Sequence, residues 1–410
     1  MSPWQEFFDV NLEEEIMATS LGIITILGLA ANWIMEKLRL PGLLGMLLVG
    51  ILMGPSGLNI MSPEMMRVSA DFREIALIII LLRAGLGLDW DVLKKVGRPA
   101  LGLSFIPGVL EGVTVMLVST VVFDFSPVQG GILGFIIAAV SPAVVVPAML
   151  ELKEERRGED KNIPTLVLAG ASLDDIVAIT IFTSFLGLYG GMDINLAGQL
   201  LQIPISIFTG IGVGYLVGLV FVRIFETHHI RDTKKVLMIL GAAILLMGFE
   251  DLIRDTIPFS GFLGVMTIGF VILLKRGIVA KRLSVKFNKI WILAEILLFV
   301  LVGAQVDLGV TLNAGGLGIL IIAAGLILRS LGVYIALLGT GLNRNEKLFC
   351  AVAYTPKATV QAAIGAVPLA YGVQGGDLIL SMAVLSIVLT APLGAVGIRY
   401  MKRYLSTLTD

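Results

Sequence analysis

The chain has 410 residues, of which 57% are hydrophobic and 15% are charged, with 30 Lys and Arg against 31 Asp and Glu. Soluble domains carry about 25% charged residues, so this composition excludes a water-soluble globule and is typical of a polytopic membrane protein. The net charge of −1 and the single cysteine argue against a nucleic-acid-binding surface, a disulfide framework and a cysteine-based metal cluster. We expect no cofactor.

Thirteen apolar stretches, some of them short or interrupted, qualify as membrane spans, because a bilayer core of about 30 Å needs about 20 mostly apolar residues per helix. In chain order, spans 1 to 13 are residues 18–34, 43–53, 75–88, 100–122, 132–150, 165–188, 200–221, 236–247, 259–274, 290–306, 317–338, 348–369 and 378–398. The sequence therefore predicts an all-α polytopic membrane protein with about 13 transmembrane helices.

The basic residues indicate which way the spans run. With the N-terminus outside, only three of the 30 Lys and Arg residues fall in outward loops, three lie within spans, and the other 24 fall in inward loops or the tail. This distribution is what the positive-inside rule predicts for an N-out, C-in topology. The loops are too short for a soluble regulatory domain, and residues 401–410 form a short cytoplasmic tail. Such compact loops favour a multi-pass protein of a prokaryotic plasma membrane.

Five ionisable residues lie near the middle of spans, where a charge costs at least a few kcal/mol and is a functional candidate by default. Asp174 and Asp175 lie about ten residues, or roughly 15 Å, from the start of span 6. Glu111 in span 4, Arg329 in span 11 and Lys357 in span 12 reach similar depths. All five charges are therefore expected near the membrane midplane.

Helix-breaking residues occur at the same depth in two spans. Span 5 contains Ser141-Pro142 and Pro147, and span 12 contains Thr355-Pro356. Proline lacks a backbone donor and disfavours helix before it, so both spans are expected to break in mid-membrane. Spans 5 and 12 are seven apart and cross in opposite directions. That pattern predicts inverted repeats whose two crossed, broken helices flank a midplane ion site.

The repeats also suggest roles for the five charges. Spans 4, 5 and 6 match spans 11, 12 and 13, which places Glu111 opposite Arg329 and favours a structural ion pair over a direct part in transport. Lys357 is equally compatible with capping the helix ends at the break and with direct participation. Asp174 and Asp175 repel each other when both are ionised, which suits a site that binds a cation and protons in competition.

Hard cations such as Na⁺ and Li⁺ prefer oxygen ligands, and Asp174 and Asp175 offer them. The hydroxyl groups of Ser141 and Thr355, together with carbonyl groups freed at the breaks, are candidates for the remaining ligands. When all five mid-depth groups are ionised, two positive charges face three negative ones. One bound Na⁺ or one proton would neutralise such a cluster.

Four motifs together resemble those of the cation/proton antiporter superfamily, and most closely its double-aspartate branch, the NHA-type sodium/proton antiporters. They are Leu81–Asp89, Ser141–Pro147, Ser172–Val177 and Pro356–Gln361. The similarity runs over about residues 20–400. It implies exchange of Na⁺ or Li⁺ for H⁺, with the family's aspartate pair at positions 174 and 175 and the second aspartate as the main ion ligand.

The same resemblance implies a homodimer in the lipid bilayer that works by elevator-like alternating access. Residues 1–99 and 189–310 would form a dimerisation domain, and residues 100–188 and 311–400 would form a moving, ion-transporting core. One departure from the family concerns Arg329, because strongly electrogenic members usually carry Lys there. Arginine does not release its proton in proteins, so the exchange of one or of two protons per cation stays open.

Three other functions are compatible with parts of this pattern. A K⁺/H⁺ antiporter would share the fold. A sodium-coupled organic-anion symporter would also use crossed broken helices, with Arg329 and Lys357 binding a carboxylate. An enzyme is disfavoured because the sequence contains no recognisable nucleophile–base arrangement. Arg83, near the inner end of span 3, is expected to extend to the membrane interface.

Overall fold

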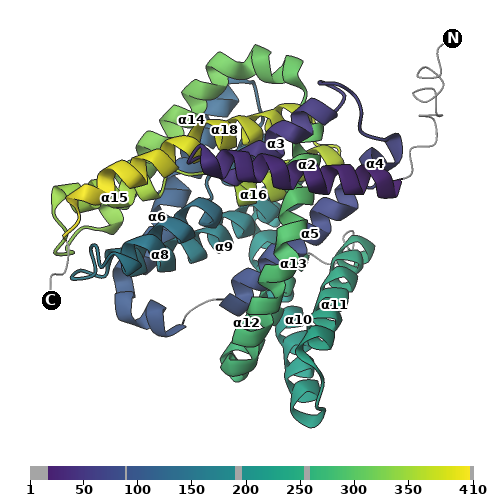
Figure 1. Cartoon of the computed structure of the whole chain (residues 1–410), viewed down its shortest axis with the longest axis horizontal. Helices are drawn as coiled ribbons and strands as arrows, with labels where there is room; N and C mark the ends of the chain where they lie inside the picture. The colour runs from purple at the N-terminus through teal and green to yellow at the C-terminus, as the bar shows by residue number, and fades with distance from the viewer. Residues whose placement is uncertain (1–16, 88–89, 190–195, 254–258, 407–410) are drawn as a thin grey trace.

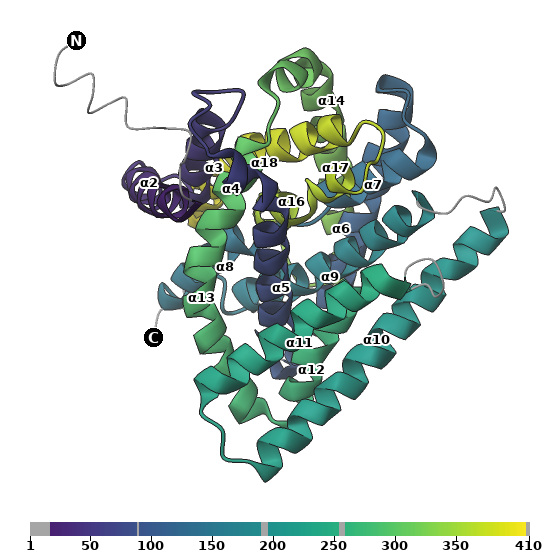
Figure 2. The same cartoon turned by 90° about the vertical axis from the view of Figure 1, so that its right-hand side faces the viewer.

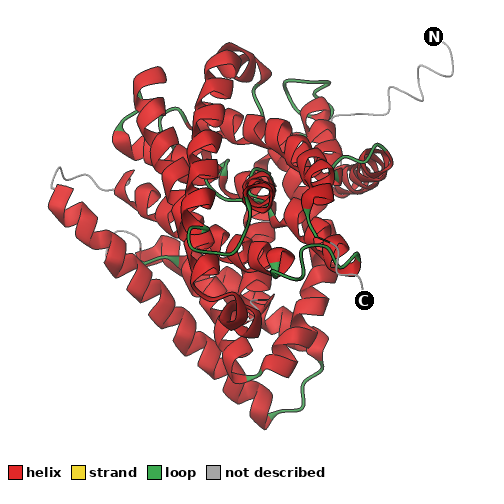
Figure 3. Cartoon of the chain, turned by 90° about the vertical axis from the view of Figure 1, so that its left-hand side faces the viewer, coloured by secondary structure: helices red, strands yellow, loops and turns green. Residues whose placement is uncertain are grey.

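The computed structural model describes residues 17–87, 90–189, 196–253 and 259–406. Within these ranges the regular structure is entirely helical (Figure 3). In chain order, the helices are α2 (Met17–Lys37), α3 (Gly42–Met53), α4 (Pro63–Arg67), α5 (Ser69–Gly87), α6 (Trp90–Val122), α7 (Pro127–Ile137), α8 (Pro142–Glu154), α9 (Ile163–Tyr189), α10 (Leu196–Thr227), α11 (Asp232–Ile253), α12 (Gly261–Lys275), α13 (Gly277–Ala304), α14 (Leu308–Ala336), α15 (Arg344–Ala353), α16 (Thr359–Ile364), α17 (Val367–Ala370), α18 (Gly376–Met401) and the 3-10 helix η2 (Lys402–Tyr404).

Eight segments of the described chain are long and apolar enough to cross a membrane. The thirteen predicted spans all fall on helices or on broken helices. The predicted spans that are not among these eight segments differ in one of three ways. Some are short, as in α3 and α12, some carry several charges, as in α5 and α11, and span 12 is interrupted. The all-helical membrane architecture is thus confirmed, whereas the count of thirteen crossings and their orientation stay predictions. Parts of the predicted domains, of one motif and of the tail lie outside the described residues. These parts are residues 1–16, 88–89 and 407–410.

The helices pack in two groups. In the first, α13 packs against α3 and α5, and α12 packs against α5 and α10. In the second, α6 packs against α7, α9 and α14, and α14 also packs against α18. Figure 1 shows α14 and α18 together on one side of the molecule, away from α10 and α11. In Figure 2, α10 and α11 run diagonally along one edge, and α16 lies near the centre.

Both predicted helix breaks are present. Residues 138–141 separate α7 from α8, and residues 354–358 separate α15 from α16. Pro142 is the first residue of α8, where its missing N–H would have no partner within the helix. Pro356 lies inside the second break. Pro142 and Pro356 therefore lie at the two interruptions, as predicted.

Pro147 behaves differently from its predicted role as a helix-breaking residue. It lies inside α8, which continues to Glu154. The fixed φ of proline is compatible with a helix, and only one intrahelical hydrogen bond is lost at this position. The break in span 5 consequently depends on the segment before Pro142 alone.

The backbone groups freed at the breaks find partners in one another and in a glutamine. The backbone N–H of Ser141 donates to the carbonyl oxygen of Pro356 at 2.8 Å, so the two breaks touch. Gln361 donates from Nε2 to three carbonyl oxygens at and just after the end of α7, at 2.8 to 3.2 Å. These bonds meet the requirement that backbone groups at membrane depth be satisfied by the protein. Only the Pro356–Gln361 motif pointed to Gln361 before the structure was known.

The first packing group contains a close helix crossing that yields a test of the fold. A Cβ on Gly303 of α13 would lie 3.1 Å from the Cα of Gly50 on α3 and would overlap the carbonyl oxygen of Leu47. We expect Gly303→Ala to lower the Tm of the purified protein, because inserting a methyl group here forces the helices apart at a cost of about 1–3 kcal/mol.

Gly241→Ala on α11 is the matched control, since a Cβ there meets no atom within 4 Å. Alanine favours helix over glycine by about 1 kcal/mol, so this variant is expected to keep or raise the Tm. Equal losses in the two variants would contradict the close crossing of α3 and α13.

Candidate ion-binding site

The five predicted mid-depth charges come together from separate parts of the chain. Glu111 lies on α6, Asp174 and Asp175 on α9, Arg329 on α14, and Lys357 in the break between α15 and α16. Asp175 is 9% exposed, and the other four are at most 1% exposed. Residues almost 250 positions apart therefore share one buried site, as their depth in the predicted spans indicated.

Four of these residues form a continuous chain of ion pairs. Arg329 contacts Glu111 through Nη1 at 2.6 Å and Asp174 through Nη2 at 2.9 Å. Lys357 contacts the same Oε2 atom of Glu111 through Nζ at 2.6 Å. Two positive and two negative groups thus balance, and the predicted Glu111–Arg329 pair is present. The side chain of Lys357 belongs to this charge network, so the residue does more than cap a helix end.

The charge network also holds the backbone of both breaks. Arg329 donates to the carbonyl oxygen of Ala138, and Asp174 accepts from the backbone N–H of Val140 at 2.8 Å. The backbone N–H of Lys357 donates to Oγ1 of Thr390 on α18 at 2.8 Å. Removing one partner from a buried pair leaves an uncompensated charge, which typically costs 3–5 kcal/mol. The network is therefore a structural element as well as an electrostatic one.

The two aspartates occupy different environments because adjacent residues on a helix point about 100° apart. Asp174 faces Arg329 and the first break. Asp175 faces a cavity of about 470 Å³, and its Oδ1 atom has no hydrogen-bond partner in the described part of the chain. Since the other four charges balance, Asp175 is the member of the cluster left without a counter-charge.

The cavity lies between the two packing groups. Residues of α5 and α13 form one wall, and residues of α8, α9 and α16 form the other. Thr359, the first residue of α16, lines the cavity together with Asp175, and its hydroxyl oxygen is buried without a partner. The hydroxyl of Ser141 is also buried and unpartnered, at the first break. Thr359 therefore brings an oxygen atom suited to a small cation to the cavity of Asp175.

Neither of the two hydroxyl residues predicted from the sequence, Ser141 and Thr355, is part of the cavity lining. Thr355 donates its Oγ1 hydrogen to the carbonyl oxygen of Val352 at 2.9 Å and is absent from the cavity lining. Thr359 lines the cavity, and the roles of Ser141 and Thr355 as ion ligands stay predictions. The signal for Thr359 was its place three residues after Pro356, where the chain re-enters a helix, but the rotation of that short helix was not readable from the sequence.

The opposite wall carries a second charged group. Arg83 of α5 donates through Nε to Oδ1 of Asn288 at 2.8 Å and lies 4.9 Å from the centre of the Trp291 ring. Glu295 also lines this wall. These α13 side chains hold Arg83 in the cavity wall, and its extension to the membrane interface stays a prediction.

Comparisons with known proteins place this arrangement among ion exchangers. The family model described as "Sodium/hydrogen exchanger, transmembrane" matches residues 22–401. Sodium/hydrogen exchanger 9B2 of Homo sapiens is 35% identical over 377 residues, covering 87% of this chain and 68% of that protein. The protein of the same name from Xenopus tropicalis is 36% identical over 378 residues, with the same coverage of both chains.

A solved structure shares the fold. The sodium proton antiporter MjNhaP1 from Methanocaldococcus jannaschii at pH 8 matches with a TM-score of 0.78, covering 93% of this chain and 95% of that one. Its sequence identity is 24%, so the likeness concerns the arrangement of the helices.

The contrast between the aspartates predicts opposite effects on stability. We expect Asp174→Asn to lower the Tm clearly, because it removes a charge that Arg329 and the N–H of Val140 hold, at a cost of about 3–5 kcal/mol. Asp175→Asn should keep or raise the Tm, because it removes a buried charge that has no partner. Thermal unfolding in detergent without Na⁺ or Li⁺ measures both, and a reversed order would contradict the assignment of the two carboxylates.

Proposed function

This chain belongs to the family of transmembrane sodium/hydrogen exchangers, and we propose that it exchanges Na⁺ or Li⁺ for H⁺ at Asp175. One observation carries the proposal. The charge network balances within itself, and Asp175, beside it, faces a cavity without a counter-charge. A buried carboxylate without a counter-charge is stabilised by binding either a cation or a proton, and the binding of one excludes the other.

The exchange follows from this competition. A cation entering the cavity binds the Asp175 carboxylate, with the hydroxyl oxygen of Thr359 and other oxygen atoms completing its shell. The proton held by the carboxylate is released as the cation binds, so one positive charge replaces another. Asp174, engaged by Arg329, positions the site and supplies negative potential beside the bound ion.

The movement that we propose uses the two packing groups as two domains. Residues 1–99 and 189–310 form the dimerisation domain, and residues 100–188 and 311–400 form the core. The cavity supports this division because it lies at their boundary, with α5 and α13 on one side and α8, α9 and α16 on the other. Sliding of the core along the dimerisation domain would carry Asp175 from one membrane face to the other, as in an elevator.

The proposed topology has thirteen crossings, N-out and C-in, in a homodimer in the plasma membrane. The contact between Ser141 and Pro356 supports crossed breaks. The matching helices α7 and α15 also begin alike, each with a capping box, Ser126 with Gln129 and Asn343 with Glu346. The two sequence relatives named above are vertebrate and the solved structure is from Methanocaldococcus jannaschii, so a prokaryotic source stays a prediction.

An organic-anion symporter is not supported by this geometry. Such a carrier needs a free cationic side chain for the carboxylate of its substrate, and both candidates, Arg329 and Lys357, are already paired with acidic groups. K⁺ in place of Na⁺ would use the same site, and the transport experiment below separates the two cations.

We expect Asp175→Asn to abolish cation-driven proton movement. In everted vesicles or proteoliposomes with a pH-sensitive dye, the unaltered protein should release protons on addition of Na⁺ or Li⁺ and respond less to K⁺. Asp175→Asn should give the signal of empty vesicles. Asp377→Asn, at an exposed position at the start of α18, is the control and should retain full activity. Full activity in Asp175→Asn would refute the proposed site.

The charge balance further predicts electroneutral exchange. A single unpaired carboxylate holds one proton or one monovalent cation, and Arg329 keeps its proton throughout. A membrane potential should then leave the equilibrium distribution of Na⁺ unchanged. Exchange of two protons per cation would move one net charge, worth about 2.3 kcal/mol at 100 mV, which is about a 50-fold shift in that distribution. Measuring the reversal potential of transport in proteoliposomes with a set membrane potential decides between one and two protons per cation.

A further inference from the structure

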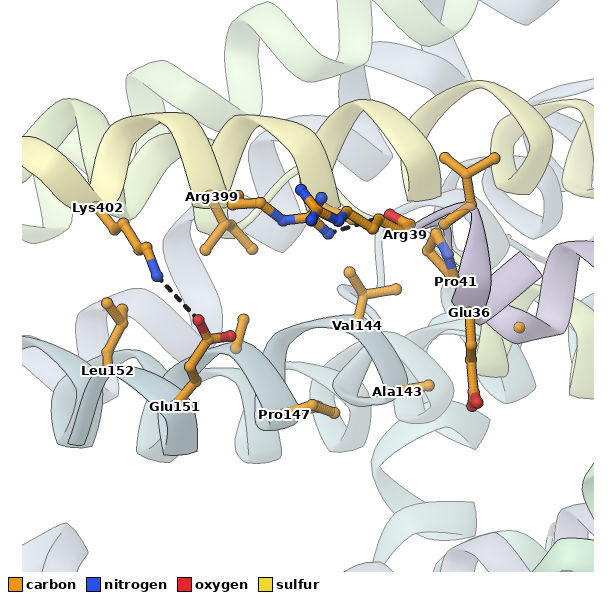
Figure 4. A pocket seen from close by; sticks show the side chains of 15 residues that line it. Glu36, Arg39, Pro41, Ala143, Val144, Pro147, Glu151, Leu152, Arg399 and Lys402 are labelled. Carbon is orange, nitrogen blue, oxygen red and sulfur yellow. Dashed lines mark hydrogen bonds and ion pairs between the residues drawn. The ribbon is translucent and has the colours of Figure 1, made fainter. Parts of the chain in front are cut away.

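A second pocket, of about 400 Å³, lies on the other side of α8 from the Asp175 cavity. The turn between α2 and α3 forms one wall, and α8 and α18 form the others (Figure 4). Its lining combines apolar side chains, among them Leu40, Val144 and Ile398, with the arginines Arg39 and Arg399. The pocket thus combines apolar walls with charged side chains, among them these two arginines.

The two arginines carry positive charge that no acidic side chain of the described residues pairs with. Arg399 donates to the backbone carbonyl oxygen of Arg39 at 3.0 Å. Neither guanidinium group has an ion-pair partner in the described part of the chain. The carboxylate of Glu36, the nearest acidic residue in sequence, accepts from Asn32 at 3.0 Å and points away from both guanidinium groups in Figure 4. An anion between the two arginines would therefore meet no carboxylate that it must displace.

The third cation of the pocket is already neutralised. Lys402 contacts Glu151 at 2.9 Å and Glu155 at 2.8 Å. The hydrogen bond from Lys402 lowers the pKa of Glu155, which keeps this partner ionised near neutral pH. Lys402 and its two carboxylates form a separate cluster, so the unbalanced charge of the pocket belongs to Arg39 and Arg399.

Aromatic residues flanking the pocket mark the depth of the lipid headgroups. Trp33 on α2 is 56% exposed, with the Nζ of Lys37 3.6 Å from the ring centre. Tyr400 on α18 is 57% exposed, with the guanidinium of Arg403 3.7 Å from its ring centre. Exposed tryptophan and tyrosine paired with basic side chains are typical of the membrane–water interface. Trp33 and Tyr400 lie on α2 and α18, which both contribute to the pocket, and this supports a position of the pocket near the headgroups.

We propose that this pocket binds the phosphate group of an anionic phospholipid. Two guanidinium groups suit a phosphate, because each offers several N–H donors in one plane. The apolar walls, and the exposed Leu38 and Val396 beside them, provide a surface for the acyl chains that a free phosphate ion would not use. Arg39 and Arg399 come from different packing groups, so the bound lipid bridges them.

Lipid binding is tested on the purified full chain in mild detergent. Phosphatidylglycerol and phosphatidylcholine with identical acyl chains are titrated while the Tm and, by native mass spectrometry, the number of bound lipids are measured. Phosphatidylglycerol should raise the Tm with a saturable dependence, because a ligand that binds only the folded protein stabilises it. Phosphatidylcholine and soluble glycerol phosphate should not.

Two variants address the site, each compared with its own Tm without lipid. Arg399→Gln removes one guanidinium group. Arg39→Asn removes the other and keeps a residue that tolerates the positive φ of 60° at this position. Each should need at least about tenfold more phosphatidylglycerol for half of the maximal shift, equivalent to about 1.4 kcal/mol. Arg223→Gln, at an exposed arginine of α10 outside the pocket, should respond like the unaltered protein.

Equal lipid responses in the two pocket variants and the unaltered protein would overturn the proposal, as would an equal shift with glycerol phosphate. The lipid site does not depend on the proposed exchange. Asp175→Asn, which should lose transport, is expected to keep the full response to phosphatidylglycerol, so failure of one proposal is distinguishable from failure of the other.

Discussion

The site depends on one electrostatic requirement, that a charge buried inside a membrane-spanning bundle be paired. Arg329 meets it for two acidic residues at once, because its guanidinium group has enough donors to reach Glu111, Asp174 and a backbone carbonyl together. The guanidinium group spreads its donors over several nitrogen atoms in one plane, so Nη1 and Nη2 reach acceptors on three separate elements, whereas a lysine would offer all its donors from one point. With Lys357 completing the balance, the unpaired charge of the cluster is confined to one residue, Asp175.

The same contacts explain how two helices are interrupted at membrane depth without a large penalty. At the first break, the carbonyl oxygen of Ala138 accepts a hydrogen bond from Arg329, and the N–H of Val140 donates one to Asp174. Gln361 satisfies three further carbonyl groups. Backbone polar groups that would cost several kcal/mol each in lipid thereby become part of the charge network. Breaks and charges stabilise each other, so neither is expected to persist without the other.

Much of this arrangement was predictable because it depends on position along the chain. Hydropathy located the helical segments, depth within them brought the five charges together, and the odd spacing of the breaks paired Glu111 with Arg329. The family resemblance implied that the second aspartate is the main ion ligand, but depth along the spans could not show which aspartate faces the cavity or that Thr359 lines it. Those features depend on the rotation of each helix about its axis, which is set by packing. The continuation of α8 through Pro147 likewise depends on local backbone geometry.

Helix α8 links the two cavities. Ala143 and Pro147 line both the cavity that contains Asp175 and the pocket that contains Arg39 and Arg399. A single helix therefore forms a shared wall, and a displacement of α8 enlarges one space as it narrows the other. Under the proposed mechanism α8 moves with the core. A lipid phosphate held between α18 and the α2–α3 turn would resist that movement, so the composition of the surrounding membrane would act directly on the helix that borders the ion site.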